Sequence, residues 1–360
     1  MAIGRNSTNV TNAIQFPVVG FAAPTGGTYS ACVSMSASLS ILPTLEADLD
    51  RFECALHNSV KTDLDFLTDV AQHLIAAGGK RVRPGFAIAC AASTSNVPQP
   101  ASDKVIMGGV AVELVHQGSL YHDDVMDEAT TRRSVESVNT RWGNMVAILS
   151  GDYLLGRASE IASDLGTDVS RILARTISRL CEGQIRELES TYVADRTEDD
   201  YLLSIEGKTA SLLEAACRIG ALASGQNEQT VETLGQFGLS YGMAFQIVDD
   251  ILDLTSTAEE AGKPTGNDLL EGNYTLPVLR ELTGPRGGEL RALLTKGISA
   301  DERDQARELI RSGTGLQESL AEARRWADLA AASLEPLPQN PGAQALRAAS
   351  DDLLARVNAV

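Results

Sequence analysis

Two short aspartate clusters constrain this chain more than any other feature of its sequence. The first places three carboxylates at i, i+1 and i+4 of an apolar, helix-compatible run: Asp123, Asp124 and Asp127. On a helix the first and last share a face, and the middle one lies about 100° away. Carboxylates in this arrangement repel one another unless a cation lies between them, and Mg²⁺ prefers such oxygen ligands. A single cluster of this kind would also fit a solvated acidic surface.

The same spacing recurs far downstream, at Asp249, Asp250 and Asp253. We call the two clusters the first and second aspartate motifs. Basic residues follow each motif within ten positions: Arg132 and Arg133 after the first, and Lys263 after the second. Two matching motifs followed by cations indicate two metal-binding surfaces that face one phosphate-bearing ligand.

These motifs resemble those of the trans-isoprenyl diphosphate synthases, also called polyprenyl synthetases. The resemblance implies an all-α fold, a single-domain helical bundle in which the motifs face each other across a central apolar cavity. It also implies Mg²⁺ as cofactor and a homodimer as assembly. The reaction would be the head-to-tail condensation of isopentenyl diphosphate with an allylic diphosphate, giving geranylgeranyl or a longer polyprenyl diphosphate.

The remaining sequence also favours a mainly helical fold. Long Ala/Leu-rich segments have helical periodicity at 104–122, 144–163, 170–188 and 211–223. The resemblance implies that the second of these packs against the helix of the first motif, where the small residues Ala147 and Gly151 would allow a close approach. Residues 1–42, rich in Ser, Thr, Asn and Gly, predict a loosely ordered extension before a catalytic domain at 43–360, and Met35 stays open as an alternative start.

The composition limits the possible binding partners of the protein and its possible cellular location. The net charge of −18 argues against nucleic acid as a partner, and it means that any diphosphate site needs local cations. The five cysteines are scattered without metal or disulfide spacing, which fits a reducing cytoplasm. No apolar run approaches the ~20 residues of a membrane-spanning helix. We therefore expect a cytoplasmic enzyme without a signal peptide or transmembrane segment.

A basic segment, Gly78-Gly-Lys-Arg-Val-Arg-Pro84, combines a glycine turn, three cations and a proline suited to the first turn of a helix. Cations beside a helix N-terminus make an anion site, although a plain basic loop would look similar. The resemblance implies that Lys80 and Arg83 bind the diphosphate of isopentenyl diphosphate. His116 corresponds to the third ligand of that diphosphate.

The same resemblance assigns residues around the allylic substrate. Arg132 would contact the allylic diphosphate and Arg133 the isopentenyl one. Lys208, in the segment Glu206-Gly-Lys-Thr, would reach the allylic diphosphate, while Thr209 and Gln246 would lie beside the reacting carbons.

The segment 261–277 resembles a lid of the family and carries Lys263. One position departs from the pattern, because many members have a lysine where this chain has Asn273. Asparagine keeps a hydrogen-bond donor but no charge, which puts one phosphate contact in doubt.

These assignments predict a mechanism. Mg²⁺ between the motifs, together with Lys208, Arg132 and Lys263, would make the allylic diphosphate a good leaving group. The isopentenyl double bond would attack the resulting cation, and the departing diphosphate would take the released proton.

Three alternatives remain: a terpene cyclase of related fold, a non-catalytic subunit of a hetero-oligomeric synthase, and a head-to-head coupling enzyme. The set Lys80, Arg83 and Arg133 argues against a cyclase, which needs no second diphosphate site. Two intact motifs argue against a silent subunit, and the basic segment argues against head-to-head coupling.

Two small residues before the first motif predict the product length. Gly118 and Ser119 lie five and four positions before it, about one helical turn back. In the resembled family a Phe or Tyr at these positions closes the floor of the tail tunnel. Gly and Ser would leave it open toward Leu114 and Ala111, so we expect a medium or long chain. Tyr121 should point to another side of the helix.

Overall fold

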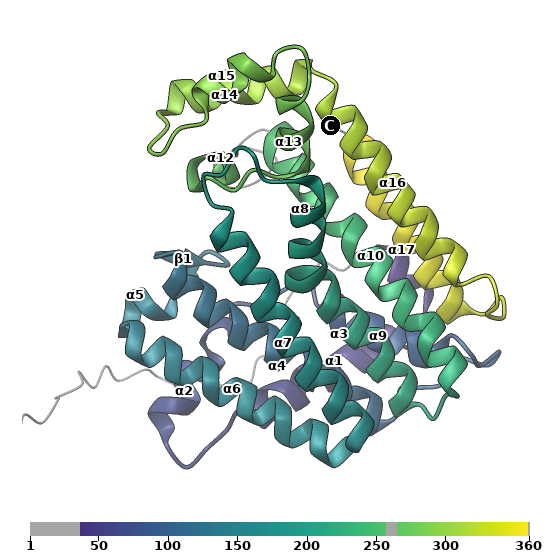
Figure 1. Cartoon of the computed structure of the whole chain (residues 1–360). Coiled ribbons are helices and arrows are strands. Elements are labelled where there is room, and N and C mark those ends of the chain that lie inside the picture. The colour runs from purple at the N-terminus through teal and green to yellow at the C-terminus, as the bar shows by residue number, and fades with distance from the viewer. Residues whose placement is uncertain (1–36, 257–264, 359–360) are drawn as a thin grey trace, which may run out of the picture. The chain divides into compact units, whose positions relative to one another are not determined.

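The computed structural model describes residues 37–256 and 265–358, which belong to one compact, almost entirely helical unit (Figure 1). The predicted all-α, single-domain fold is confirmed. The first elements are η1 (Ala37–Ile41), α1 (Leu45–Ser59), α2 (Asp65–Ala76), α3 (Val82–Ala92), α4 (Asp103–Met126), β1 (Thr131–Arg132), β2 (Val135–Glu136), α5 (Val138–Trp142), α6 (Asn144–Leu165) and α7 (Thr167–Glu189).

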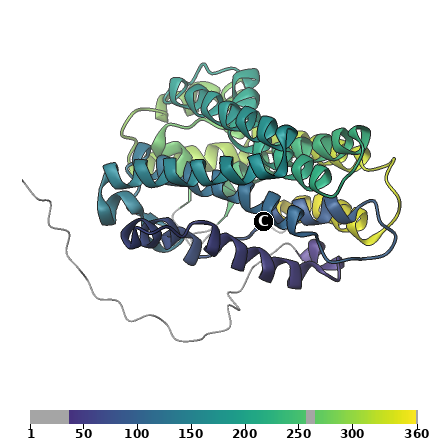
Figure 2. The same cartoon turned by 90° about the horizontal axis from the view of Figure 1, so that it is seen from below.

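The second part of the chain is helical throughout its described residues. Its elements are α8 (Glu198–Ile205), η2 (Glu206–Ala210), α9 (Ser211–Ala223), α10 (Glu228–Thr255), α12 (Asn267–Glu271), α13 (Leu276–Leu282), α14 (Gly287–Leu293), α15 (Ala300–Ser312), α16 (Gly315–Ser333) and α17 (Pro341–Asn358). Figure 2 shows several of the long helices running side by side. In the part of the chain that the structure covers, no helix is long and apolar enough to cross a membrane.

The two aspartate motifs lie on the two longest helices, α4 and α10. Side-chain caps fix where each begins: Ser102 Oγ accepts from the Val105 amide at 3.4 Å, and Asn227 Oδ1 accepts from the Thr230 amide at 2.9 Å. Helix α4 packs against α1, α3, α6 and α9, whereas α10 packs against α9 and α16 (Figure 1). Both motifs are thus carried by rigid, well-packed elements.

The predicted close packing of α6 on the first-motif helix is confirmed. A Cβ built on Gly151 would lie 2.3 Å from Nε2 of His122 on α4, so a larger residue there would have to displace the imidazole ring. Ala147, one turn earlier on α6, is completely buried. The small side chains let the two helix backbones approach each other.

Ordered structure begins a few residues before the predicted boundary at residue 42. Residues 37–41 form η1, which packs on α17, and the Ser38 amide donates to Asp352 Oδ2 at 3.2 Å. Leu39 and Leu42 are 1% and 2% exposed. Burial of these two side chains stabilises the segment, although the polar composition of residues 1–42 predicts a loosely ordered extension. Residues 1–36 lie outside the described part of the chain.

Candidate active site

The first aspartate motif ends α4. The Asp127 amide donates to the Asp123 carbonyl at 2.8 Å, so these residues lie one above the other on a helix face, as their spacing predicts. Burial raises the pKa of Asp123 to about 6; Lys208 opposes this shift and Asp127 adds to it. Burial also raises the pKa of Asp127. The two carboxylates therefore carry negative charge that the protein compensates only in part.

Asp124, the middle residue of the motif, is completely buried and points elsewhere. Its Oδ1 accepts from Nε of Arg132 at 2.7 Å. Its Oδ2 is buried without a hydrogen-bond partner among the described residues. One oxygen thus holds Arg132 in place, and the other is free for a ligand.

A two-residue turn directs the side chains of Arg132 and Arg133 to different places. Arg133 and Ser134 connect β1 to β2 with φ values of 53° and 63°, the geometry of a type I′ turn. Arg132 points toward Asp124, whereas the Arg133 guanidinium lies against the basic segment, 3.3 Å from where a Gly79 Cβ would be. Neighbouring arginines therefore reach two different places, as the resemblance implies.

Arg133 joins Arg83 and His116 in a group that we call the cationic cluster. Arg83 Nε is buried without a partner among the described residues, and burial lowers the pKa of Arg83. Burial and then the charges of Arg83 and Arg133 lower the pKa of His116 well below its usual value, which keeps the imidazole neutral at pH 7. Lys80 is exposed at the same turn. Two close guanidinium groups repel each other, so a bound anion would stabilise this cluster.

Arg81, the remaining cation of the basic segment, has a structural role. It is 4% exposed and forms ion pairs with Glu53 on α1 (2.5 Å) and Glu113 on α4 (2.9 Å). Its charge is therefore neutralised inside the protein and is not available to a substrate.

The π-helical turn η2 presents Lys208 and Thr209. Lys208 Nζ donates to Glu187 Oε1 at 2.5 Å. Thr209 Oγ1 donates to Gln246 Oε1 at 2.7 Å, and Gln246 Nε2 donates to Asp250 Oδ1 at 2.8 Å. The structure thus brings Thr209 and Gln246 together, two residues that the resemblance assigns to the surroundings of the reacting carbons.

The second aspartate motif lies near the C-terminal end of α10. Asp250 is 4% exposed, and its Oδ2 accepts from the Tyr201 hydroxyl at 2.6 Å. Burial raises the pKa of Asp250 to about 7; the Tyr201 hydrogen bond opposes the shift and Asp249 adds to it. Asp249 itself is exposed, and Asp253 Oδ2 accepts from the Asp268 amide at 3.3 Å.

Three further acidic residues, which the sequence analysis missed, belong to the site. Burial raises the pKa of Glu271, and Asp127 and Asp253 raise it further, so Glu271 lies beside both motifs. Burial and then Asp250 and Asp253 raise the pKa of Asp268 well above its usual value. The third, Glu187, binds Lys208. Asp268 and Glu271 stand three positions apart, which was a usable signal, whereas Glu187 is a single acid on a helix.

Mg²⁺ fits these side chains. The donors are carboxylates, one Asp124 oxygen is buried without a partner among the described residues, and burial raises the pKa of Asp123 and Asp250, a cost that a nearby cation would offset. Among the residues that the structure describes, no group of three or more His, Cys, Asp or Glu side chains is arranged to hold a metal ion by itself.

Gly118 lies against α6, and its role at the tunnel floor stays a prediction. A Cβ there would be 3.0 Å from the Gly151 carbonyl oxygen and 3.3 Å from Leu155 Cγ. Leu114 and Ala111, the expected path of the tail, are completely buried. Helix α6 already occupies the room beside this side of α4.

Ser119 remains a candidate for the chain-length position. It lies four residues before Asp123 and therefore on the face of the first motif. It is half-buried, and its hydroxyl donates to the His116 carbonyl at 2.9 Å. The Tyr121 hydroxyl donates to the Val70 carbonyl at 2.6 Å, so this ring points toward α2, to another side of α4 as expected.

Two residues of the expected diphosphate site, Lys263 and Asn273, belong to the chain around α12. Lys263 lies outside the described residues. Asn273 follows α12, and its amide donates to the Asp268 carbonyl at 2.7 Å. The uncharged Asn273 therefore stands next to the acidic group formed around the second motif.

Aspartate motifs on two long helices, beside a cationic cluster, define the class of helical enzymes that handle prenyl diphosphates. The family model "Polyprenyl synthetase" matches residues 64–311. The chain belongs to the polyprenyl synthetase family, and it is a transferase of prenyl groups. The resemblance stated from the sequence is thereby confirmed.

Known relatives match almost the whole chain. Nonaprenyl diphosphate synthase of Mycobacterium tuberculosis is 40% identical over 315 residues, 87% of this chain and 93% of the relative. Heptaprenyl diphosphate synthase component 2 of Geobacillus stearothermophilus is 39% identical over 306 residues, 84% and 94% of the two chains. The crystal structure of a polyprenyl synthase from Caulobacter crescentus, complexed with calcium and isoprenyl diphosphate, has a TM-score of 0.81 at 33% identity and covers 89% of this chain and 98% of its own.

Proposed function

We propose that this enzyme condenses isopentenyl diphosphate with an allylic diphosphate, head to tail and with Mg²⁺, into a polyprenyl diphosphate. The observation that carries the proposal is the spacing of two groups of different chemistry along α4. His116, which lies in the cationic cluster beside Arg83 and Arg133, precedes Asp123, in the first motif, by seven residues, or about 10 Å along one helix face. A cationic group and a carboxylate group thus lie two helical turns apart.

The cationic cluster suits isopentenyl diphosphate, whose diphosphate must stay attached. Arg83 and Arg133 would bind it directly, because guanidinium groups donate paired hydrogen bonds to phosphate oxygens. Neutral His116 adds a donor or acceptor without further repulsion, and Lys80 adds charge at the entrance.

The carboxylates suit the allylic substrate, whose diphosphate must leave. Asp123, Asp127, Asp249 and Asp253 would hold Mg²⁺, which when bound neutralises charge on the leaving group. Lys208 and Arg132 both act on the carboxylates of the first motif and would bind the same diphosphate.

The bond changes follow from the different fates of the two diphosphates, one of which stays attached while the other leaves. The allylic C–O bond breaks, and the terminal carbon of isopentenyl diphosphate forms a C–C bond with the allylic carbon. The new C=C bond forms as a proton leaves to the departing diphosphate. The pair formed by Thr209 and Gln246 would orient the reacting carbons, because each side chain fixes the rotamer of the other.

We propose a product longer than geranylgeranyl diphosphate. The names of two similar proteins, nonaprenyl and heptaprenyl diphosphate synthases, support a medium or long chain. The small, half-buried Ser119 beside Asp123 supports it too, because no aromatic ring blocks the first turn below the motif on that face. The tail would occupy an apolar tunnel between helices.

We also propose that two copies of this chain associate. Apolar side chains that are 44–75% exposed lie at i, i+3 and i+4 near the start of α6: Met145, Ile148 and Leu149. Ile185 and Leu188, on the last turns of α7, are 54% and 47% exposed. Helices α6 and α7 follow each other directly at Gly166 and pack against each other. One relative is named as a component, which makes association with a different chain the competing assembly.

The test uses the purified full chain with farnesyl diphosphate, labelled isopentenyl diphosphate and Mg²⁺. We expect consumption of label and products that are sized by chromatography beyond geranylgeranyl. Chelation should abolish turnover, and added Mg²⁺ should restore it. No consumption by the chain alone, but turnover with a second protein, would instead support a component of a two-chain enzyme.

A further inference from the structure

The turn that carries Lys208 and Thr209 is not a regular α-helix. Residues Glu206–Ala210 form the π-helical turn η2, which continues directly into α9. Such turns hold one extra residue, are rare, and occur frequently at functional sites. Because the regular helix is the more stable form, contacts elsewhere must favour η2.

Helix α7 supplies these contacts through residues four positions apart on one face: Arg179, Gly183 and Glu187. The middle residue makes the closest approach, since a Cβ on Gly183 would lie 2.4 Å from the Lys208 amide nitrogen. At the far end, Glu187 Oε1 accepts from Lys208 Nζ at 2.5 Å. Helix α7 therefore contacts both the backbone and the ammonium group of Lys208.

Arg179 spans the π turn. Its Nη2 lies 2.9 Å from Glu206 Oε1, at the first residue of η2, and its Nη1 lies 2.6 Å from Glu214 Oε2 on α9. In a regular α-helix, residues eight positions apart differ by about 80° in direction. The extra residue of a π turn reduces this angle to about 20°, so both carboxylates face α7. One guanidinium group can hold both glutamates because η2 is a π turn.

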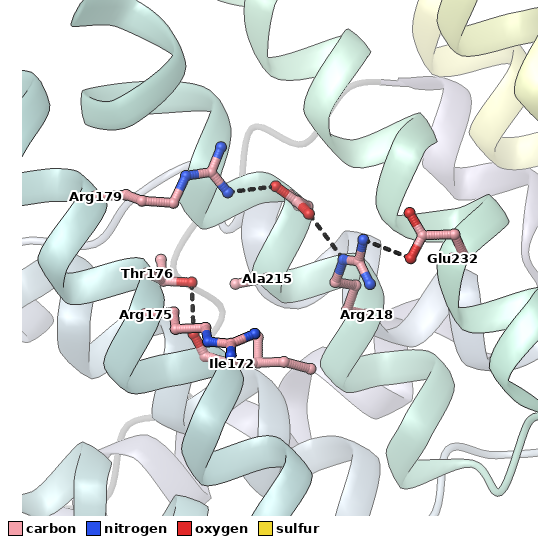
Figure 3. A pocket seen from close by; sticks show the side chains of 8 residues that line it. Ile172, Arg175, Thr176, Arg179, Ala215, Arg218 and Glu232 are labelled. Carbon is pink, nitrogen blue, oxygen red and sulfur yellow. Dashed lines mark hydrogen bonds and ion pairs between the residues drawn. The ribbon is translucent and has the colours of Figure 1, made fainter. Parts of the chain in front are cut away.

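Further ion pairs connect the Arg179 site to a third helix. Arg218 on α9 binds Glu214 at 2.8 Å and Glu232 on α10 at 2.8 Å, which links three helices. These side chains line a pocket of about 370 Å³ that also includes Arg175 (Figure 3). Arg175 lies one turn before Arg179 on α7, but it forms no ion pair with any residue that the structure describes.

We propose that Arg179 is a positioning residue for Lys208: its two ion pairs hold η2 as a π turn and so set where the Lys208 ammonium meets the allylic diphosphate. This inference rests on the proposed role of Lys208. Arg175 is the matched control, because it has the same chemistry, lies on the same helix and opens onto the same pocket.

The kinetic test compares Arg179→Ala and Arg175→Ala in the wild-type and Lys208→Ala backgrounds. Arg179→Ala should lower kcat/KM for the allylic substrate roughly tenfold to a hundredfold, with the KM for isopentenyl diphosphate unchanged. It should have no further effect once Lys208 is removed, since the two residues act as one unit. Arg175→Ala should resemble the parent. Equal losses in both backgrounds, or an equal loss with Arg175→Ala, would overturn the proposal.

A second measurement does not depend on turnover. Amide hydrogen exchange over residues 207–211 should become faster in Arg179→Ala and stay unchanged in Arg175→Ala. Glu206→Gln, which removes one ion pair at a partly exposed residue, should give the same change if Arg179→Ala does not fold. Unchanged exchange in these variants would refute the role of Arg179, whereas wild-type protein that consumes no isopentenyl diphosphate would refute the proposed function alone.

Discussion

Asp123 and Asp124 are adjacent residues with different surroundings. Asp123 shares its charge with Asp127 and Lys208, whereas buried Asp124 uses one oxygen to hold Arg132. The helical rotation of about 100° between neighbours separates the two carboxylates. A motif of three aspartates thus contains residues that face the ligand and one that orients a cation.

Replacing a carboxylate that faces the ligand should stop turnover without unfolding the protein. For Asp123→Ala we expect kcat to fall by about 10²–10³, because leaving-group stabilisation of this size is lost with one such group. Asp249→Ala should be milder. Steady-state assays and circular dichroism would measure both effects, with Asp152→Ala, an exposed residue on α6, as the control. Near-normal activity of Asp123→Ala at limiting Mg²⁺ would contradict the metal assignment.

Arg83→Ala should raise the KM for isopentenyl diphosphate by about tenfold or more, with little change in the KM for the allylic substrate. Lys80→Ala should act in the same direction. Because burial disfavours the Arg83 charge, and its Nε is buried without a partner among the described residues, its removal should not lower the melting temperature. If the KM for the allylic substrate rises instead, the two diphosphate sites have been exchanged in our interpretation.

At the scale of the element, the face of α4 on which a small residue lies decides whether it can limit the chain length of the product. Ser119 lies on the face of Asp123, whereas Gly118 lies about 140° away and meets α6. Ser119→Phe should therefore shorten the product while the protein stays folded, as product chromatography would measure. Gly118→Phe should instead destabilise the protein by about 1–3 kcal/mol, because a larger side chain overpacks the contact with α6.

Thermal unfolding separates these two outcomes. A folded Gly118→Phe protein of normal stability that makes shorter products would restore Gly118 as the floor. An unchanged product distribution in Ser119→Phe would exclude Ser119 from the tunnel.

The elements that the sequence predicted are those whose signals are local. Apolar periodicity predicted the ends of α4, α6, α7 and α9 to within four residues, and the i, i+1, i+4 spacing identified both motifs. The side of α4 on which Gly118 lies is local information too, because five residues of helix separate it from Asp123 by about 140°.

Other features depend on contacts between distant segments. Glu187 stands 21 positions before Lys208, and Tyr201 stands 49 positions before Asp250, so no pattern in the sequence connects either pair. The π turn η2 also escapes sequence analysis, because one extra residue in a helix leaves no periodic signal of its own. Burial of Leu39 in η1 depends on α17, at the other end of the described chain.

At the scale of the whole molecule, the exposed apolar residues of α6 and α7 predict self-association. Leu149→Asp should convert a dimer to a monomer, because it places a charge in the buried interface; sedimentation velocity would measure this. Leu64→Asp is the matched control, since Leu64 is 58% exposed and Leu149 is 61% exposed. A monomeric wild type, or a dimer that survives Leu149→Asp, would contradict the proposed interface.

The contact between η1 and α17 has a consequence for the newly made chain. The hydrogen bond from Ser38 to Asp352 joins residues 314 positions apart. At about 5–20 residues per second, a ribosome delivers α17 on the order of tens of seconds after Leu39 and Leu42 have been made. For that interval the two leucines lack the helix that buries them, and a chaperone can bind them. The last helix to be synthesised therefore completes the burial of the first described segment.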